Sequence, residues 1–201
     1  MKEVLKKVGP VIRALGFRGS GQNYRKTDGD FVFVINFQGS PAGGVFYVNF
    51  GAQPVFIPAE CNADLTTLKE YECILRRRVG EEWPWEMSDA LFRTLVAEIT
   101  ATQAAFFGNA QTLRSSLAVE EPVDLLRRFT STTEARASLH LARAAAQLGH
   151  VDQARKFVDL GFKLAGAHAD LFCGDLQRVL DGLPGAAPQP GVAPDGASPR
   201  R

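Results

Sequence analysis

The sequence predicts an α+β protein in which an N-terminal helix packs on an antiparallel sheet of three to five strands, followed by a C-terminal helical segment. Three observations predict this order: helical spacing of apolar residues at the start, two neighbouring stretches that alternate with period 2, and a shift to Ala, Leu and Arg beyond residue 108. The chain has 201 residues, 45% of them hydrophobic and 22% charged, which is typical of a soluble globular protein with an ordinary core.

The first helix is predicted from apolar residues that repeat with helical spacing between Val4 and Leu15. Gly16 is a natural C-terminal stop for this helix. Pro10 lies inside the pattern, and it predicts either a kink or the point where the regular helix begins.

A three-stranded antiparallel meander is predicted after this helix. Asp28-Gly29 is a two-residue signal for a tight hairpin turn, and it joins the stretch 22–27 to Phe31–Gln38. Centring the turn on these two residues places Arg25 opposite Val32. The stretch Val45–Gln53 then adds the third strand.

Alternation along these strands separates two faces of the sheet. The aromatic face is predicted to hold Tyr24, Phe31, Phe33, Ile35, Phe37, Phe46, Val48 and Phe50. The opposite face, which we call the polar face, is predicted to hold Asn23, Arg25, Val32, Val34, Asn36, Gln38, Val45, Tyr47 and Asn49. Because burial of one large apolar side chain contributes about 1.5–3 kcal/mol, we expect the first helix to cover the aromatic face.

Glu70–Val79 alternates in a way that favours a fourth strand, although helical spacing also fits it. On a strand, Arg76 and Arg78 share one face while Arg77 points to the other, and we expect pairing with nearby acidic residues. Trp83-Pro84-Trp85 follows, and two aromatic residues around a proline are expected to lock a loop onto the core, with stacking on a ligand ring as the alternative.

The rest of the chain is predicted to be helical. A long amphipathic helix begins at Met87 and ends near Gly108, and Pro122 suits the first turn of another helix. Ser131–Glu134 has the spacing of a capping box and is expected to open a helix that runs to Leu148. We therefore expect an α+β domain at 1–108, a helical extension at 109–182 and a disordered Pro/Gly/Ala-rich tail at 183–201.

The carboxamides and arginines of the sheet are the candidate ligand-binding residues. The full set is Asn23, Arg25, Asn36, Gln38, Tyr47, Asn49, Arg76 and Arg78. Hydrogen-bonding groups without a pair of carboxylates suit recognition better than acid–base catalysis. The alternative is that these side chains bond to loop backbone or meet solvent.

Composition argues against several other functions. A net charge of +1 gives no reason to expect specific nucleic-acid binding, and the interrupted apolar residues at the start predict no signal peptide or membrane span. Three scattered Cys fit reduced thiols in a cytosol, and the three His match no common metal-ligand spacing. We therefore expect a cytoplasmic protein with no catalytic set, metal or cofactor.

An ordered set of motifs resembles one bacterial family, the domain of unknown function 4304. The set comprises LGF at Leu15–Phe17, YRKTDGDFVFVINFQ at Tyr24–Gln38, VNFG at Val48–Gly51 and the Cys73–Gly80 stretch with Trp83 and Trp85. The resemblance spans about residues 1–107 and implies a helix with an antiparallel sheet. It implies no activity that can be assigned to particular residues.

The helical extension resembles a single tetratricopeptide-type hairpin. The pattern consists of small residues where two helices would touch, the break Gly149-His150 and the return helix Val151–Ala165. We find no second copy at the same period, and one hairpin cannot bury its apolar face alone. It is therefore expected to cap or extend the first domain.

Two functions remain open from the sequence. The first is a non-catalytic binding or protein-interaction module, for example of the accessory or toxin-neutralising type, with another protein as its partner. The alternative is an enzyme or sensor for a phosphorylated or nucleotide-like small molecule. In that case Arg25, Arg76 or Arg78 would hold the anion, and the carboxamides of the sheet would orient it.

Overall fold

The computed structural model describes residues 2–57, 64–129, 133–166 and 169–185. The part of the tail predicted to be disordered from residue 186 onward lies outside these ranges. The elements are α1 (Lys2–Ala14), β1 (Arg18–Ser20), β2 (Asn23–Asp28), β3 (Phe31–Gly39), β4 (Val45–Pro54), η1 (Glu70–Glu72), β5 (Leu75–Pro84), α2 (Asp89–Gln111), α3 (Leu113–Val119), α4 (Pro122–Phe129), α5 (Glu134–Gln147), α6 (Val151–Leu164) and α7 (Asp170–Asp181). The predicted α+β order is confirmed.

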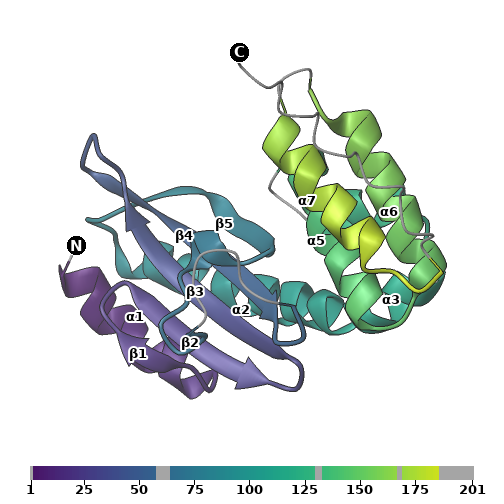
Figure 1. Cartoon of the computed structure of the whole chain (residues 1–201). Helices are drawn as coiled ribbons and strands as arrows, with labels where there is room; N and C mark the ends of the chain where they lie inside the picture. Colours follow the sequence, from purple (N-terminus) through teal and green to yellow (C-terminus); the bar gives the residue numbers. More distant parts are fainter. Residues whose placement is uncertain (1, 58–63, 130–132, 167–168, 186–201) are drawn as a thin grey trace, which may run out of the picture.

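One antiparallel sheet forms the N-terminal half, with strand order β1-β2-β3-β4-β5 in the described residues. Figure 1 shows α2 running behind this sheet and α5, α6 and α7 lying together beyond its end. The short strand β1 was not predicted, because three residues are too few to display a period. Pro10 lies inside the single helix α1, and Gly16 follows the helix with a φ of 89°.

The hairpin between β2 and β3 corrects the predicted register. Asp28 pairs with Phe31, so the loop is Gly29-Asp30 and not Asp28-Gly29. Gly29 has a φ of 56°, as the first loop position of a type II′ hairpin turn requires. The partner of Arg25 is therefore Val34, two residues from the predicted Val32. A shift of two leaves every side chain on its predicted face.

The aromatic face forms the core, as predicted. Phe33, Phe37, Phe46 and Phe50 are all at most 1% exposed. The buried side chains of α1 and α2 belong to the same apolar cluster, so both helices cover this face. The sequence had assigned that role to the first helix alone.

The stretch predicted as a strand at Glu70–Val79 divides in two. Glu70–Glu72 is the 3-10 turn η1, and the strand β5 begins only at Leu75 and extends to Pro84. Trp83 is buried and its indole N–H donates to the Val79 carbonyl at 3.2 Å. Trp85 stacks on Phe46 with ring centroids 4.2 Å apart, so both tryptophans pack on the core.

The helical half contains the predicted hairpin of α5 and α6, with α7 packed against both. Thr133 caps α5 and accepts a hydrogen bond from the Arg136 N–H, so the cap is not Ser131, which lies outside the described residues. A Cβ on Gly161 would lie 2.7 Å from Ser138 Oγ, which shows how closely α5 and α6 approach. The domain boundary at 108 stays a prediction, and α2 continues across it to Gln111.

Candidate binding face

Four side chains lie in register across the sheet and form a row on the polar face. Asn23 of β2 pairs with Asn36 of β3, Asn36 pairs with Asn49 of β4, and Asn49 pairs with Arg78 of β5. We call these four residues the polar row. Cross-strand neighbours that pair directly have Cβ atoms about 4.5–5.5 Å apart, so each side chain can contact the next.

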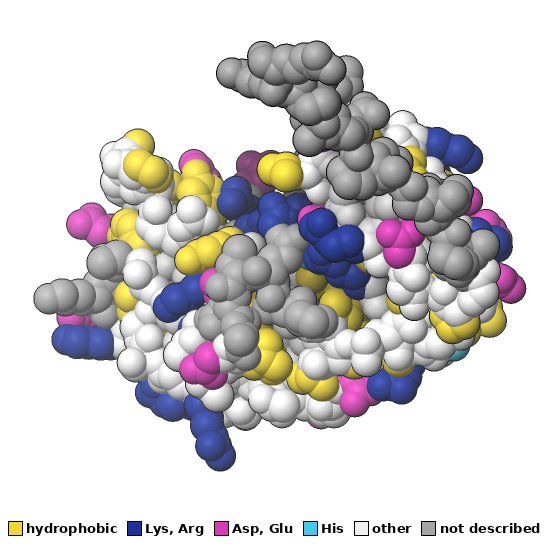
Figure 2. Space-filling view, viewed as in Figure 1, with side chains coloured by type: hydrophobic (Ala, Val, Ile, Leu, Met, Phe, Trp, Pro, Cys, Tyr) yellow, Lys and Arg dark blue, Asp and Glu magenta, His cyan; other side chains and the backbone are white. Residues whose placement is uncertain are grey.

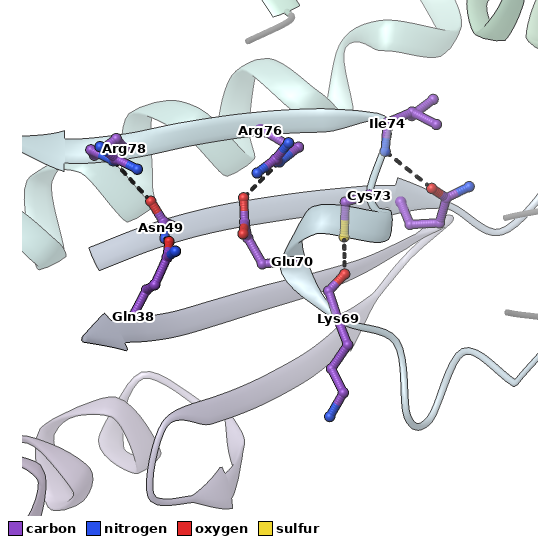
Figure 3. Close-up of polar contacts among 9 residues, drawn as sticks. Gln38, Asn49, Lys69, Glu70, Cys73, Ile74, Arg76 and Arg78 are labelled. Carbon is purple, nitrogen blue, oxygen red and sulfur yellow. Dashed lines mark hydrogen bonds and ion pairs between the residues drawn. The ribbon is translucent and has the colours of Figure 1, made fainter. Parts of the chain in front are cut away.

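Hydrogen bonds join the polar row in two pairs, Asn36 with Asn23 and Arg78 with Asn49, and tie Asn49 to Gln38. Asn36 Nδ2 donates to Asn23 Oδ1 at 2.9 Å, and Asn49 Nδ2 donates to Gln38 Oε1 at 2.9 Å. Arg78 Nε donates to Asn49 Oδ1 at 3.1 Å (Figure 3). Because a guanidinium only donates, this last bond fixes which way the Asn49 carboxamide points. Asn49 is 4% exposed and has both ends bonded.

Arg78 is also held by an aromatic ring. Its guanidinium lies 4.3 Å from the ring centroid of Tyr47, and Tyr47 pairs with Gln38 on the neighbouring strand. Arg78 and Gln38 are both exposed. Within the described ranges Arg78 has no carboxylate within ion-pair distance. The guanidinium is therefore held by Asn49 and Tyr47, with its charge uncompensated by a contacting acid in the described part of the chain.

The other two arginines of the predicted set bind their own chain. Arg25 Nε donates to the Leu68 carbonyl at 2.5 Å, and its Nη2 donates to the Thr67 carbonyl at 2.9 Å. Arg76 Nε contacts Glu70 Oε1 at 2.7 Å, and the Glu70 side chain is 6% exposed. Both arginines thereby fasten the segment 67–72 to the sheet. The predicted pairing of the arginine run with nearby acids is found at Arg76.

This segment covers the other half of the polar face. Val32, Val34, Leu68 and Cys73 form a second buried apolar cluster there. The close approach depends on Gly51, because a Cβ at that position would lie 2.6 Å from Cys73 Sγ. The half that carries the polar row keeps the exposed side chains of Gln38 and Arg78. Figure 2 shows several Lys and Arg side chains gathered on the side of the molecule turned away from α2.

Cys73 is unsuited to nucleophilic chemistry. Burial raises the pKa of its thiol well above the usual range, and the nearby Glu70 carboxylate adds to this effect. Its Sγ lies 3.5 Å from the Lys69 carbonyl. A thiol held in the protonated form cannot supply the thiolate that attacks a substrate.

The sequence had not singled out Gln53, whose position is structurally important. It is fully buried on the covered half, where its Nε2 donates to the carbonyls of Pro54 and Ile57 and its Oε1 accepts from the Ile74 N–H. In the sequence, the role of Gln53 is indicated only by a carboxamide that lies in a strand directly before a proline. Its bonds hold the two ends of the β4–β5 connection together.

A separate cavity of about 530 Å³ lies at the β1–β2 edge. Arg18 and Arg25 pair directly across these two strands and both line it, together with Lys26 and Thr66. Like charges placed directly opposite each other destabilise a sheet unless something compensates them. Lys26 is compensated in part by Asp28, which lies 3.3 Å away.

The comparisons with known proteins bear on the N-terminal half. Residues 8–102 match the family described as Domain of unknown function (DUF4304). The family resemblance inferred from the motifs is thereby confirmed. No curated protein and no solved structure matches the chain. The DUF4304 region contains all five strands, and therefore the whole polar row and the cavity at the β1–β2 edge.

Two further findings concern metal ligands and helix length in the described residues. They contain no group of three or more His, Cys, Asp or Glu side chains that could hold a metal ion. None of their helices combines the length and the apolar character that a membrane crossing requires.

Proposed function

We propose that this protein is a non-catalytic binding module that recognises an acidic segment of another protein with the exposed half of its polar face. The observation that carries the proposal is the Arg78 guanidinium, which Asn49 and Tyr47 hold in one orientation without a contacting carboxylate in the described part of the chain. A guanidinium and a carboxylate form charge-assisted hydrogen bonds in a bidentate geometry, which gives both energy and specificity.

The neighbouring groups support an acceptor-rich partner. The Gln38 oxygen is occupied by Asn49, so its Nε2 is the group that remains to face a ligand. Arg78 Nε is likewise occupied, which leaves its terminal nitrogens as donors. Donors on β3 and β5, the two strands that flank β4, match a series of carboxylates better than they match a cationic or apolar surface. Because the network exists without a partner, little side-chain entropy remains to be lost on binding.

The proposal is tested with a synthetic peptide rich in Asp and Glu, titrated into the full chain by calorimetry. Arg78→Ala is expected to weaken binding by about tenfold or more, which corresponds to about 1.4 kcal/mol. Arg93→Ala, on the exposed surface of α2, is the matched control and is expected to leave the affinity unchanged. Equal affinity for parent and Arg78→Ala, or a demonstrated turnover of any substrate at this face, would contradict the proposal.

A second candidate function is a sensor for a phosphorylated small molecule, and the cavity at the β1–β2 edge favours it. Arg18, Arg25 and Lys26 supply positive charge to a space large enough for such a ligand. Thermal shift with inorganic phosphate and with a panel of nucleotides tests this candidate. Stabilisation that Arg18→Ala abolishes and Arg78→Ala preserves would support it. Absence of any shift would exclude it.

A further inference from the structure

The strand β5 presents a long open edge. The strand order gives it one neighbour, β4, whereas the opposite edge of the sheet is the three-residue strand β1. β5 extends over ten residues, from Leu75 to Pro84. An edge of this length exposes unpaired N–H and C=O groups that can pair with another strand.

The charges along this edge have an unusual order. The sequence from Arg76 to Glu82 is Arg-Arg-Arg-Val-Gly-Glu-Glu, with Val79 at its centre. Arg77, Arg78, Glu81 and Glu82 are all exposed. No ion pair joins any of these four to another described residue. Before Val79 the strand therefore carries two exposed arginines, and after Gly80 two exposed glutamates, that have no ion pair within the described ranges, whereas Arg76 is paired with Glu70.

We propose that a second copy of this chain docks along β5 in antiparallel orientation, with the two-fold axis at Val79. In that register Arg77 faces Glu81 of the second copy, and Arg76 faces Glu82 of the second copy. The two-fold axis repeats this arrangement, so two Arg77–Glu81 pairs form between the copies and no like charges meet, while Arg76 already contacts Glu70 within its own chain. An isologous contact of this kind joins the two five-stranded sheets into one continuous sheet.

In this register the two-fold axis places the regular segment Arg76–Val79 of each copy opposite the irregular segment that follows Val79 in the other copy. From Arg76 to Val79, β5 pairs regularly with β4. Between Val79 and Trp83 it carries extra residues relative to β4, and Gly80 has a φ of 64°. A Cβ on Gly80 would lie 3.1 Å from Glu98 of α2, so this bulge leans toward the helix. Because a bulge can protect an edge from pairing, the oligomeric state of the full chain is the direct test of whether this edge accepts a second strand.

The choice of a second copy over an unrelated strand comes from charge complementarity. A foreign strand would need acidic residues opposite the arginines and basic residues opposite Glu81 and Glu82. A second copy of β5 in antiparallel orientation supplies this order of charges. The proposed contact is made by the backbone edge of β5 and by the Arg77 and Glu81 side chains, so it does not depend on the proposed function, although Arg78 belongs both to β5 and to the polar row.

Charge reversal tests the register. The molar mass of the full chain is measured by light scattering after size exclusion, with a value of twice 21.9 kDa expected for the parent at high concentration. Arg77→Glu places like charges opposite Glu81, and Glu81→Arg places like charges opposite Arg77. Each single variant is therefore expected to weaken dimerisation by at least about tenfold. Lys163→Glu on α6 makes the same change in net charge as Arg77→Glu, at an exposed site away from β5, and is expected to leave dimerisation unchanged.

Mixing the two single variants gives the sharpest result. In the mixed dimer, each glutamate of the Arg77→Glu chain faces an arginine of the Glu81→Arg chain, so an equimolar mixture is expected to dimerise although each variant alone does not. The double variant Arg77→Glu/Glu81→Arg is expected to recover the parent affinity. A monomeric parent at all concentrations, or a dimer that tolerates both single reversals, would overturn the proposal. Circular dichroism of each variant confirms that it is folded.

Discussion

Removal of the Phe107 ring is the most informative test of how α2 is held on the aromatic face of the sheet. Phe107 is 4% exposed, and its ring centroid lies 4.0 Å from that of Phe33, 5.5 Å from Phe50, 5.6 Å from Phe106 and 5.8 Å from Phe17. Truncation of a buried Phe to Ala lowers the free energy of unfolding by about 3–5 kcal/mol. Because the side chain has four aromatic neighbours, we expect Phe107→Ala to lower the free energy of unfolding by about 4–5 kcal/mol.

The assay is urea unfolding of the full chain followed by circular dichroism. With a slope of about 2 kcal/mol per M, the midpoint should fall by about 2 M. Leu171→Ala is the matched control, since Leu171 is 90% exposed and its truncation should change stability by less than about 0.5 kcal/mol. If the free energy of unfolding of Phe107→Ala lay within about 1 kcal/mol of the parent value, the helix α2 would not be the part that covers the aromatic core.

The same contact predicts the behaviour of a shorter fragment. Phe107 lies beyond the matched range 8–102, so a fragment that ends at residue 102 should not fold stably.

Three further predictions follow from individual contacts. Gly51→Ala should lower the free energy of unfolding in urea by about 1–3 kcal/mol, because the new Cβ would overlap Cys73 Sγ. Gly108→Ala is the control, and it should be neutral or stabilising because the space around Gly108 is open. Burial, reinforced by two neighbouring arginines, lowers the pKa of His140 from 6.5 to about 4. As the pH falls, the unfolded chain therefore binds a proton at this position before the folded chain does. The free energy of unfolding should decrease by about 3 kcal/mol between pH 6.5 and pH 4. His140→Leu should remove that part of the pH dependence, and an unchanged slope would contradict the assignment. Because burial raises the pKa of the Cys73 thiol, iodoacetamide should label Cys173 in the native protein and Cys73 only after denaturation, as peptide mass spectrometry would detect.

The sequence predicted the two faces of the sheet because alternation depends only on strand parity. Phe33 and Phe37 lie on the buried face whichever register the hairpin adopts. The register itself was wrong because Asp28-Gly29-Asp30 offers two adjacent positions for the loop, and the choice depends on which one places Gly29 first. In Glu70–Val79, the alternation of Glu70–Glu72 has another cause, because these residues fold back over Gly51 and are not part of the strand.

The candidate site could be predicted by residue type but not by bonding partner. Alternation places Arg25 on the polar face and places Arg76 and Arg78 together on one face of a fourth strand, so the sequence does not distinguish the roles of the three arginines. Only the path of the segment 64–73 distinguishes them, because it brings backbone carbonyls to Arg25 and the Glu70 carboxylate to Arg76. A connection whose course depends on tertiary packing leaves no periodic signal, and so Arg78 could not be separated from the other two.

The different partners of these arginines predict different consequences for their removal. Loss of Arg76 would leave the buried Glu70 carboxylate without its cation, and an uncompensated buried charge is costly. Loss of Arg78 would remove one hydrogen bond from Asn49, whose Nδ2 keeps its bond to Gln38. Since a neutral hydrogen bond contributes about 0.5–1.5 kcal/mol and one to a charged group about 1.5–3, Arg78→Ala should remain folded at ordinary temperature. A loss of binding in Arg78→Ala can therefore be attributed to the surface, whereas the same loss in Arg76→Ala could come from displacement of the whole segment. This difference makes Arg78 the position at which binding and folding can be separated.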